Sequence, residues 1–128
     1  MRLLLDTSVL IDALRSRRAR RAWLAELVRD GHRLETSALN FAEVYAGMRP
    51  EEERGTREFL GALQCHPVTS STAESAGRLK SQWARKGRSL TLADTIIAAV
   101  AMEHGCALAT DNRKDFPMPE LRLYDLPE

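Results

Sequence analysis

Short apolar runs alternate with longer segments of helical periodicity along this chain, and this alternation constrains its fold more than any other feature. The apolar runs at residues 2–5 and 106–110 indicate buried strands, and helical periodicity fills most of the sequence between them. Strands that alternate with helices are typical of a mostly parallel sheet covered by helices. The sequence therefore predicts an α/β fold.

The boundaries of the elements follow from turn and capping residues. The predicted strands are residues 2–5, 33–36, 64–68, 106–110 and 121–124. The predicted helices are residues 7–14, 17–30, 37–48, 51–62, 71–86 and 91–104. Gly31 ends the second helix, Pro50 limits the third, and Pro67 confines its strand to a sheet edge. A capping box of Ser71 and Glu74 is expected to open the fifth helix.

The composition favours a single folded domain over residues 1–128. Hydrophobic residues make up 44% and charged residues 29%, which excludes a disordered chain. Two cysteines without a C-x-x-C pair favour a reducing compartment, and no apolar run reaches the ~20 residues that span a bilayer. We therefore expect a cytoplasmic protein without membrane contact. The net charge of +1 permits nucleic-acid binding without requiring it.

Two acidic residues follow predicted strands directly. Asp6 comes after the strand at 2–5, and Asp111 comes after the strand at 106–110. In parallel sheets, functional groups gather beyond the carboxyl ends of the strands, so both carboxylates are expected at one edge. Each also has a purely structural explanation, since Asp6 can cap a helix and Asp111 can belong to a turn.

Two further acids lie inside predicted helices with apolar or small neighbours. Glu43 shares a polar stripe with Asn40 and Gly47, although a lone helical glutamate is usually a solvated surface residue. Asp94 lies three residues after Thr91, where a capping box also explains it. Several carboxylates that converge would repel one another unless a cation neutralised them. Carboxylate oxygens select Mg²⁺ or Mn²⁺, and such ions can activate water for phosphodiester hydrolysis.

Four segments in this order resemble the PIN domain family, and most closely its VapC-type toxins from bacterial toxin–antitoxin pairs. They are LLLDTSVLID, NFAEVYAG, LTLADTIIAAVA and LATDNRKDF, and the likeness extends from residue 1 to about residue 125. The resemblance implies a Rossmann-like three-layer α/β/α sandwich around a five-stranded, mostly parallel sheet. It also implies a Mg²⁺- or Mn²⁺-dependent endoribonuclease that forms a homodimer and is inhibited by a cognate antitoxin protein.

The resemblance carries over to individual residues. Three core acids match as catalytic and metal-binding positions: Asp6, Glu43 and Asp94. The polar residues expected to support them are Thr7, Ser8, Asn40, Thr110 and Asp115. The fourth acidic position of the family falls here on Asn112, which Asp111 and Asp115 flank, and Asp111 and Asn112 are kept as catalytic candidates. This departure favours one tightly held ion, with a second arriving with the substrate.

Basic residues near these segments are candidates for binding the RNA backbone. They are Arg17, Arg18, Arg85, Lys86 and Arg88. Both clusters also fit solvated surface, and the first also fits a face that meets the antitoxin. Two other functions remain open: a non-catalytic module of the same fold that binds RNA or protein, and a structure-specific DNA nuclease.

Overall fold

The computed structural model describes residues 1–127 of the chain. The strands are β1 (Arg2–Leu5), β2 (Arg33–Ser37), β3 (Gln64–His66), β4 (Ala107–Ala109) and β5 (Leu123–Tyr124). The helices are α1 (Thr7–Leu14), α2 (Arg20–Arg29), α3 (Ala38–Gly47), α4 (Glu53–Gly61), α5 (Ser70–Arg85) and α6 (Leu92–Glu103). Two 3₁₀ turns, η1 (Pro50–Glu52) and η2 (Arg113–Asp115), complete the described part. Residue 128, which the expected domain includes, lies outside it.

The five strands form one parallel sheet in the order β3-β2-β1-β4-β5. Leu4 of β1 pairs with Glu35 of β2 on one side and with Leu108 of β4 on the other. The expectation of a five-stranded, mostly parallel sheet is therefore confirmed, and β3 lies at an edge as Pro67 predicted.

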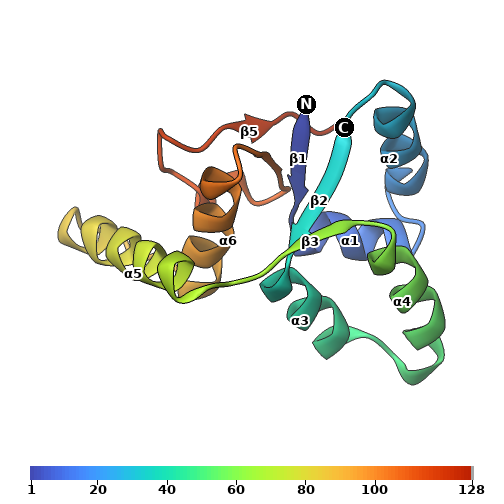
Figure 1. Ribbon diagram of the computed structural model, residues 1–128, viewed down its shortest axis with the longest axis horizontal. Helices are drawn as coiled ribbons and strands as arrows, with labels where there is room; N and C mark the ends of the chain where they lie inside the picture. Colours follow the sequence, from blue (N-terminus) through green and yellow to red (C-terminus); the bar gives the residue numbers. More distant parts are fainter. Residues whose placement is uncertain (128) are drawn as a thin grey trace.

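Helices cover both faces of the sheet, which confirms the three-layer sandwich. Figure 1 shows β1 and β2 between α1, α2 and α4 on one side and α5 and α6 on the other. Side chains of β1 alternate between the two cores: Leu3 and Leu5 pack with α1, α2 and α4, whereas Leu4 packs with α6. Among residues 1–127, no helix is long and apolar enough to cross a membrane.

The structure corrects two predicted helix starts. The helix expected at 17–30 begins only at Arg20, because Ser16, Arg18 and Ala19 have left-handed φ angles of 52°, 54° and 53°. The capping box expected at Ser71 is also wrong. Thr69 caps α5 instead, and its hydroxyl accepts a hydrogen bond from the Thr72 N–H at 3.1 Å.

Candidate functional site

The strand order reverses beside β1, and the candidate site lies at the carboxyl ends of the strands there. The chain runs from β1 through β2 to β3 on one side and then returns to β4 and β5 on the other. Asp6 follows β1, and Thr110 follows β4, its neighbour in the sheet. In open parallel sheets, this reversal leaves a crevice in which ligands bind.

Asp6 is buried at this crevice, with 5% of its surface exposed. One carboxylate oxygen accepts a 2.9 Å hydrogen bond from the Thr7 N–H and so caps α1. The other oxygen accepts a 2.6 Å hydrogen bond from the Thr110 hydroxyl. The capping role expected for Asp6 is therefore present, and Thr110 holds the same carboxylate from the neighbouring strand.

A chain of hydrogen bonds fixes Glu43 on α3. The Thr7 hydroxyl donates to Glu43 Oε1 at 2.6 Å, and Asn40 Nδ2 donates to the Thr7 oxygen at 3.0 Å. Asn40 is fully buried and takes its own orientation from Ser37, with which it forms the capping box of α3. The polar stripe seen in the sequence is thus a positioning chain that ends at a carboxylate.

Asp94 lies in the first turn of α6, beside the carboxylates of Asp115 and Glu43. Thr91 caps this helix, since its hydroxyl accepts the Asp94 N–H at 3.1 Å. Burial and the negative charges of Asp115 and Glu43 raise the pKa of Asp94 above its usual range. We call Asp6, Glu43, Asp94 and Asp115 the acid set.

The acid set suits a hard cation. Burial first, and then the charges of Asp94 and Glu43, raise the pKa of Asp6. The buried Ser8 hydroxyl finds no hydrogen-bond partner within residues 1–127. A bound cation would offset the repulsion between the carboxylates, and a water molecule in its shell would give the Ser8 hydroxyl a hydrogen-bond partner. The four carboxylates of the acid set do not form a complete coordination shell by themselves, because no three of them bring their oxygens within 4.8 Å of one another.

Asp111 belongs to a different set of contacts. Its Oδ1 accepts 2.9 Å hydrogen bonds from both Arg18 and Arg20. Asn112 is exposed, and its backbone N–H donates to the Thr110 hydroxyl oxygen at 3.0 Å. The charge of Asp115 acts on Asp94, whereas the carboxylate of Asp111 is paired with two arginines.

The five basic candidates differ in how they are held. Arg88 donates to the Lys114 carbonyl in η2, so it lies beside the last segment of the site. Lys86 lies over the Trp83 ring, 4.5 Å from its centroid, and Arg85 donates to Ser81 within α5. Arg17 and Arg18 lie on the exposed loop between α1 and α2. Only Arg18 of that pair contacts a residue beside the site.

Sequence reasoning missed a buried polar cluster on the α6 face of the sheet. Glu35, His66 and Cys106 bring their ligand atoms within 4.8 Å, and Arg2 forms a two-pronged ion pair with Glu35 at 2.7 and 2.8 Å. Burial opposes ionisation, but hydrogen bonds from Arg2 and His66 lower the pKa of Glu35 to about 2. Burial and Glu35 raise the pKa of Cys106 to about 11, so its thiol stays protonated. In this cluster, Arg2 neutralises the charge of the Glu35 carboxylate. The only sequence signal for the cluster is that Glu35 lies within a predicted strand.

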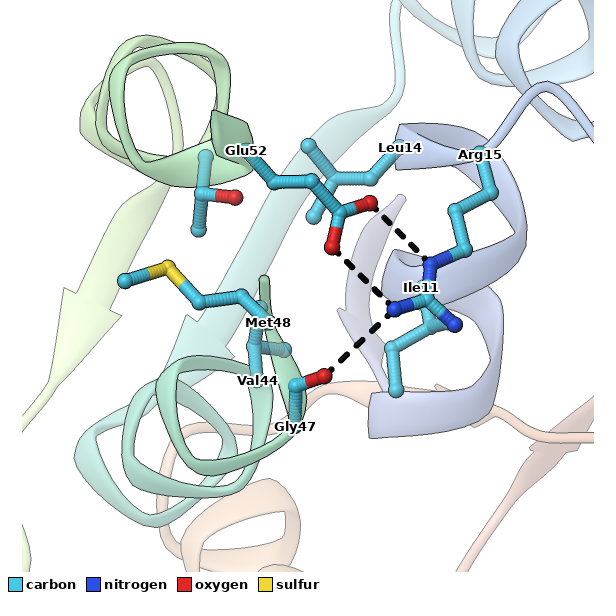
Figure 2. Close-up of a pocket in the computed structure, with 8 residues that line it drawn as sticks. Ile11, Leu14, Arg15, Val44, Gly47, Met48 and Glu52 are labelled. Carbon is cyan, nitrogen blue, oxygen red and sulfur yellow. Dashed lines mark hydrogen bonds and ion pairs between the residues drawn. The ribbon is translucent and has the colours of Figure 1, made fainter. Parts of the chain in front are cut away.

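A small cavity between α1, α3 and α4 is not a substrate site. Figure 2 shows Ile11, Val44 and Met48 around it, with the Arg15 guanidinium bound to Glu52 and the Gly47 carbonyl. Its volume of about 20 Å³ leaves room for little more than one water molecule. The Arg15–Glu52 pair therefore ties α1 to the turn before α4.

Comparisons with known proteins agree with this fold and site. The model of the PIN domain family matches residues 3–118. Ribonuclease VapC19 of Mycobacterium tuberculosis is 34% identical over 120 residues, which cover 93% of this chain and 96% of that protein. Ribonuclease VapC10 of the same organism is 36% identical over 118 residues, which cover 92% and 88%.

Solved structures give the same picture. A toxin–antitoxin complex from Klebsiella pneumoniae contains a chain that superposes with a TM-score of 0.78 at 28% identity, covering 97% of this chain and 99% of that one. VapBC2 from Rickettsia felis, bound to a promoter DNA fragment, superposes with a TM-score of 0.83 at 22% identity, covering 99% and 100%. The latter likeness concerns the fold alone.

Proposed function

The chain belongs to the PIN domain family, and from that premise we propose that it is a metal-dependent endoribonuclease, the toxin of a type II toxin–antitoxin pair. Relatives named as ribonucleases align over more than nine-tenths of the chain, and a chain of a toxin–antitoxin complex superposes over nearly all of it. The observation that carries the proposal is the acid set, which joins four segments of the chain at the reversal point of the sheet.

We assign the roles within the site as follows. Asp6, Glu43 and Asp94 hold the metal ion, directly or through water, and Asp115 is the fourth acid. Thr110 fixes the Asp6 carboxylate and Thr7 fixes that of Glu43, so the two acids meet the ion with little freedom to reorient. Ser8 offers its hydroxyl to the water around the ion.

Mg²⁺ or Mn²⁺ is the proposed cofactor, because the donor set consists of carboxylate and hydroxyl oxygens. When bound, such an ion lowers the pKa of water and stabilises charge that develops on a phosphate. Hydrogen bonds from Thr110 and Thr7 hold the carboxylates of Asp6 and Glu43 in place. Hydrolysis by water would leave a 5′-phosphate and a 3′-hydroxyl on the cut RNA.

The partners follow from the same premise. The proposal includes a cognate antitoxin protein, an RNA substrate and a homodimer. We place the protein in the cytoplasm, since its RNA substrates are there and Cys65 and Cys106 are free thiols.

The test is a cleavage assay on total bacterial RNA with the purified, partner-free protein in Mg²⁺, in Mn²⁺ and in EDTA. Asp94→Asn keeps the size of the side chain and removes the charge, whereas Asp30→Asn makes the same change at the exposed end of α2. Discrete cleavage that needs the metal and is lost only in Asp94→Asn is expected. Loss in both variants would point to unfolding rather than to the site.

Two results would replace the proposal. Cleavage of structured DNA but of no RNA would favour the DNA nuclease. No cleavage of either, together with calorimetry that detects no Mn²⁺ binding, would favour the non-catalytic module.

A further inference from the structure

A broad cleft opens beside the acid set, on the side of the loop between α1 and α2. Its volume is about 710 Å³, which is ample for a nucleotide unit. The cleft reaches Thr110, the residue that donates to Asp6, so it is continuous with the candidate site. We call it the arginine cleft after the three arginines that line it: Arg18, Arg20 and Arg113.

One carboxylate oxygen in the arginine cleft serves two guanidinium groups. Asp111 Oδ1 accepts from Arg18 and from Arg20, each at 2.9 Å. Arg20 is 2% exposed, and a buried charge of this kind depends on its carboxylate partner. Arg18 differs, because 62% of its side chain is exposed and water solvates the guanidinium in any case. Arg18 can therefore leave Asp111 at little cost, whereas Arg20 cannot.

The remaining charges of the cleft are weakly held. Arg113 pairs with Asp125 at 3.2 Å, but the two side chains are 51% and 96% exposed. Asp12 lies 3.9 Å from Arg18 Nε, which is beyond hydrogen-bonding distance. Pairs this exposed contribute about 0–1 kcal/mol, so a phosphate with several acceptor oxygens competes with them readily.

The loop that presents Arg18 has an unusual backbone. Ser16, Arg18 and Ala19 all have φ angles between 52° and 54°, a region that residues with a Cβ seldom occupy. Such conformations cost on the order of 1 kcal/mol each and persist where the surrounding structure fixes them. The Arg20–Asp111 pair anchors one end of this loop and thereby holds Arg18 at the mouth of the cleft.

From these observations, and resting on the proposed ribonuclease function, we propose that the arginine cleft binds a phosphate of the RNA strand that neighbours the cut site. Arg18 exchanges the Asp111 carboxylate for this phosphate, while Arg20 keeps Asp111 and the loop in place. Arg113 contacts the same segment of the RNA backbone. The cleft thus sets which nucleotides lie against the acid set.

The test measures RNA binding apart from cleavage. A fluorescein-labelled single-stranded oligouridylate of about 12 nucleotides, within the usual range of site sizes, is titrated with the protein in EDTA at several salt concentrations. Arg18→Gln is expected to weaken binding roughly tenfold and to reduce the slope of log Kd against log salt by about 0.7, the value for one phosphate contact. Arg29→Gln, which makes the same change at the exposed last turn of α2, is the matched control and is expected to change both less.

Two further variants separate contact from structure. Arg18→Lys keeps a charge that can reach a phosphate, so it should retain most of the salt slope. Asp111→Asn removes the charge on which buried Arg20 depends, so it should lower the melting temperature, and RNA binding should weaken as the loop that presents Arg18 loses its anchor. Thermal unfolding followed by circular dichroism checks that each variant is folded.

Two outcomes would overturn the proposed phosphate site in the arginine cleft. They are unchanged RNA binding in Arg18→Gln, and equal effects of Arg29→Gln and Arg18→Gln on RNA binding. Cleavage of RNA by the wild-type protein is scored separately in Mg²⁺ and Mn²⁺. If the wild-type protein cuts nothing yet Arg18 shows the expected binding effect, the ribonuclease function fails and the phosphate site stands.

Discussion

At the scale of single residues, the candidate site depends on side chains that hold other side chains. Thr7 donates to Glu43, Asn40 donates to Thr7, and Thr110 donates to Asp6, all within 3.0 Å. Hydrogen bonds of this kind reduce the cost of gathering like charges, because each carboxylate keeps a donor when water is excluded. Substitution of a positioning residue should therefore affect metal binding more than folding.

Thr7→Val tests this directly. The variant keeps the shape of the side chain but removes the hydroxyl, so Glu43 loses its donor and Asn40 loses an acceptor. We expect Mn²⁺ affinity and cleavage rate to fall roughly 10- to 100-fold, with Thr7→Ser restoring most of both. Calorimetry measures the affinity, and an unchanged affinity in Thr7→Val would remove Thr7 from the positioning chain.

Repulsion within the acid set predicts a gain in stability when one charge is removed. Burial, Asp115 and Glu43 raise the pKa of Asp94, so its ionised form destabilises the metal-free protein at neutral pH. Asp94→Asn keeps the Thr91 cap and is expected to raise the melting temperature in EDTA by roughly 1–3 °C, a small gain because Asp94 is partly exposed and solvent screens the repulsion. Mn²⁺ should then stabilise the wild-type protein but not the variant. A lower melting temperature in EDTA would mean that Asp94 serves the helix rather than the site.

At the scale of helices and strands, the sequence pattern located each α-helix and each strand of residues 1–127, but it did not predict the 3₁₀ turns η1 and η2 and could not fix each end. Helix α6 begins and ends within one residue of its predicted limits, because Thr91 caps it and Gly105 follows its final turn. The start of α2 was wrong by three residues, since nothing in the local sequence reveals the positive φ angles of Arg18 and Ala19. The loop ends at the Arg20–Asp111 pair, which joins residues 91 positions apart.

The same limit applies to the candidate site. Asp6 and Glu43 could be selected from local pattern, because an acid directly after an apolar strand or on a polar helical stripe stands out. The choice between Asp111 and Asp115 could not be made, since it depends on which way the turn after β4 directs each side chain. Glu35 was missed because its neutralising partner, Arg2, lies on another strand.

Glu35 should be essential to the packing of the sheet. It is fully buried on β2 and takes hydrogen bonds from Arg2 on β1 and His66 on β3, so it ties three strands together. Glu35→Gln would weaken the hydrogen bonds that this buried side chain accepts from Arg2 and His66, and should lower the free energy of unfolding by about 1–3 kcal/mol. Urea unfolding measures this cost, with Arg33→Gln at the exposed start of β2 as the control. A loss below about 1 kcal/mol would contradict the structural role.

At the scale of the whole molecule, two neutralised carboxylates determine how the protein responds to acid. Hydrogen bonds lower the pKa of Glu35 to about 2 against the effect of burial, and those from Arg15 and Arg49 lower the pKa of Glu52 to about 2. Below the ordinary glutamate pKa of 4.5, these two carboxyl groups bind protons in the unfolded chain but stay ionised in the folded protein. Their stabilisation is therefore present above pH 4.5 and is lost as the pH falls toward about 2.

The stability of the protein should accordingly fall more steeply with decreasing pH between about pH 4.5 and about pH 2. The urea concentration at the unfolding midpoint of the wild-type protein is expected to fall progressively from about pH 4.5 to about pH 2. Glu52→Gln should flatten the dependence only slightly, because its pair with Arg15 is partly exposed and solvent screens it. A urea midpoint that stays constant down to about pH 2.5, close to the lowered pKa values of about 2, would show that neither ion pair forms in solution.

The pairing of β1 with β4 also bears on how the protein is made. Leu5, beside Asp6, lies in register with Ala109, and Asp115 follows a few residues later. A ribosome adds about 5–20 residues per second, so Asp6 leaves the exit tunnel several seconds before its partners do. Chains that stop short of residue 115 lack an acid from the set. Under the proposed function, a growing chain therefore gains its full acid set only after η2 (Arg113–Asp115) has left the ribosome.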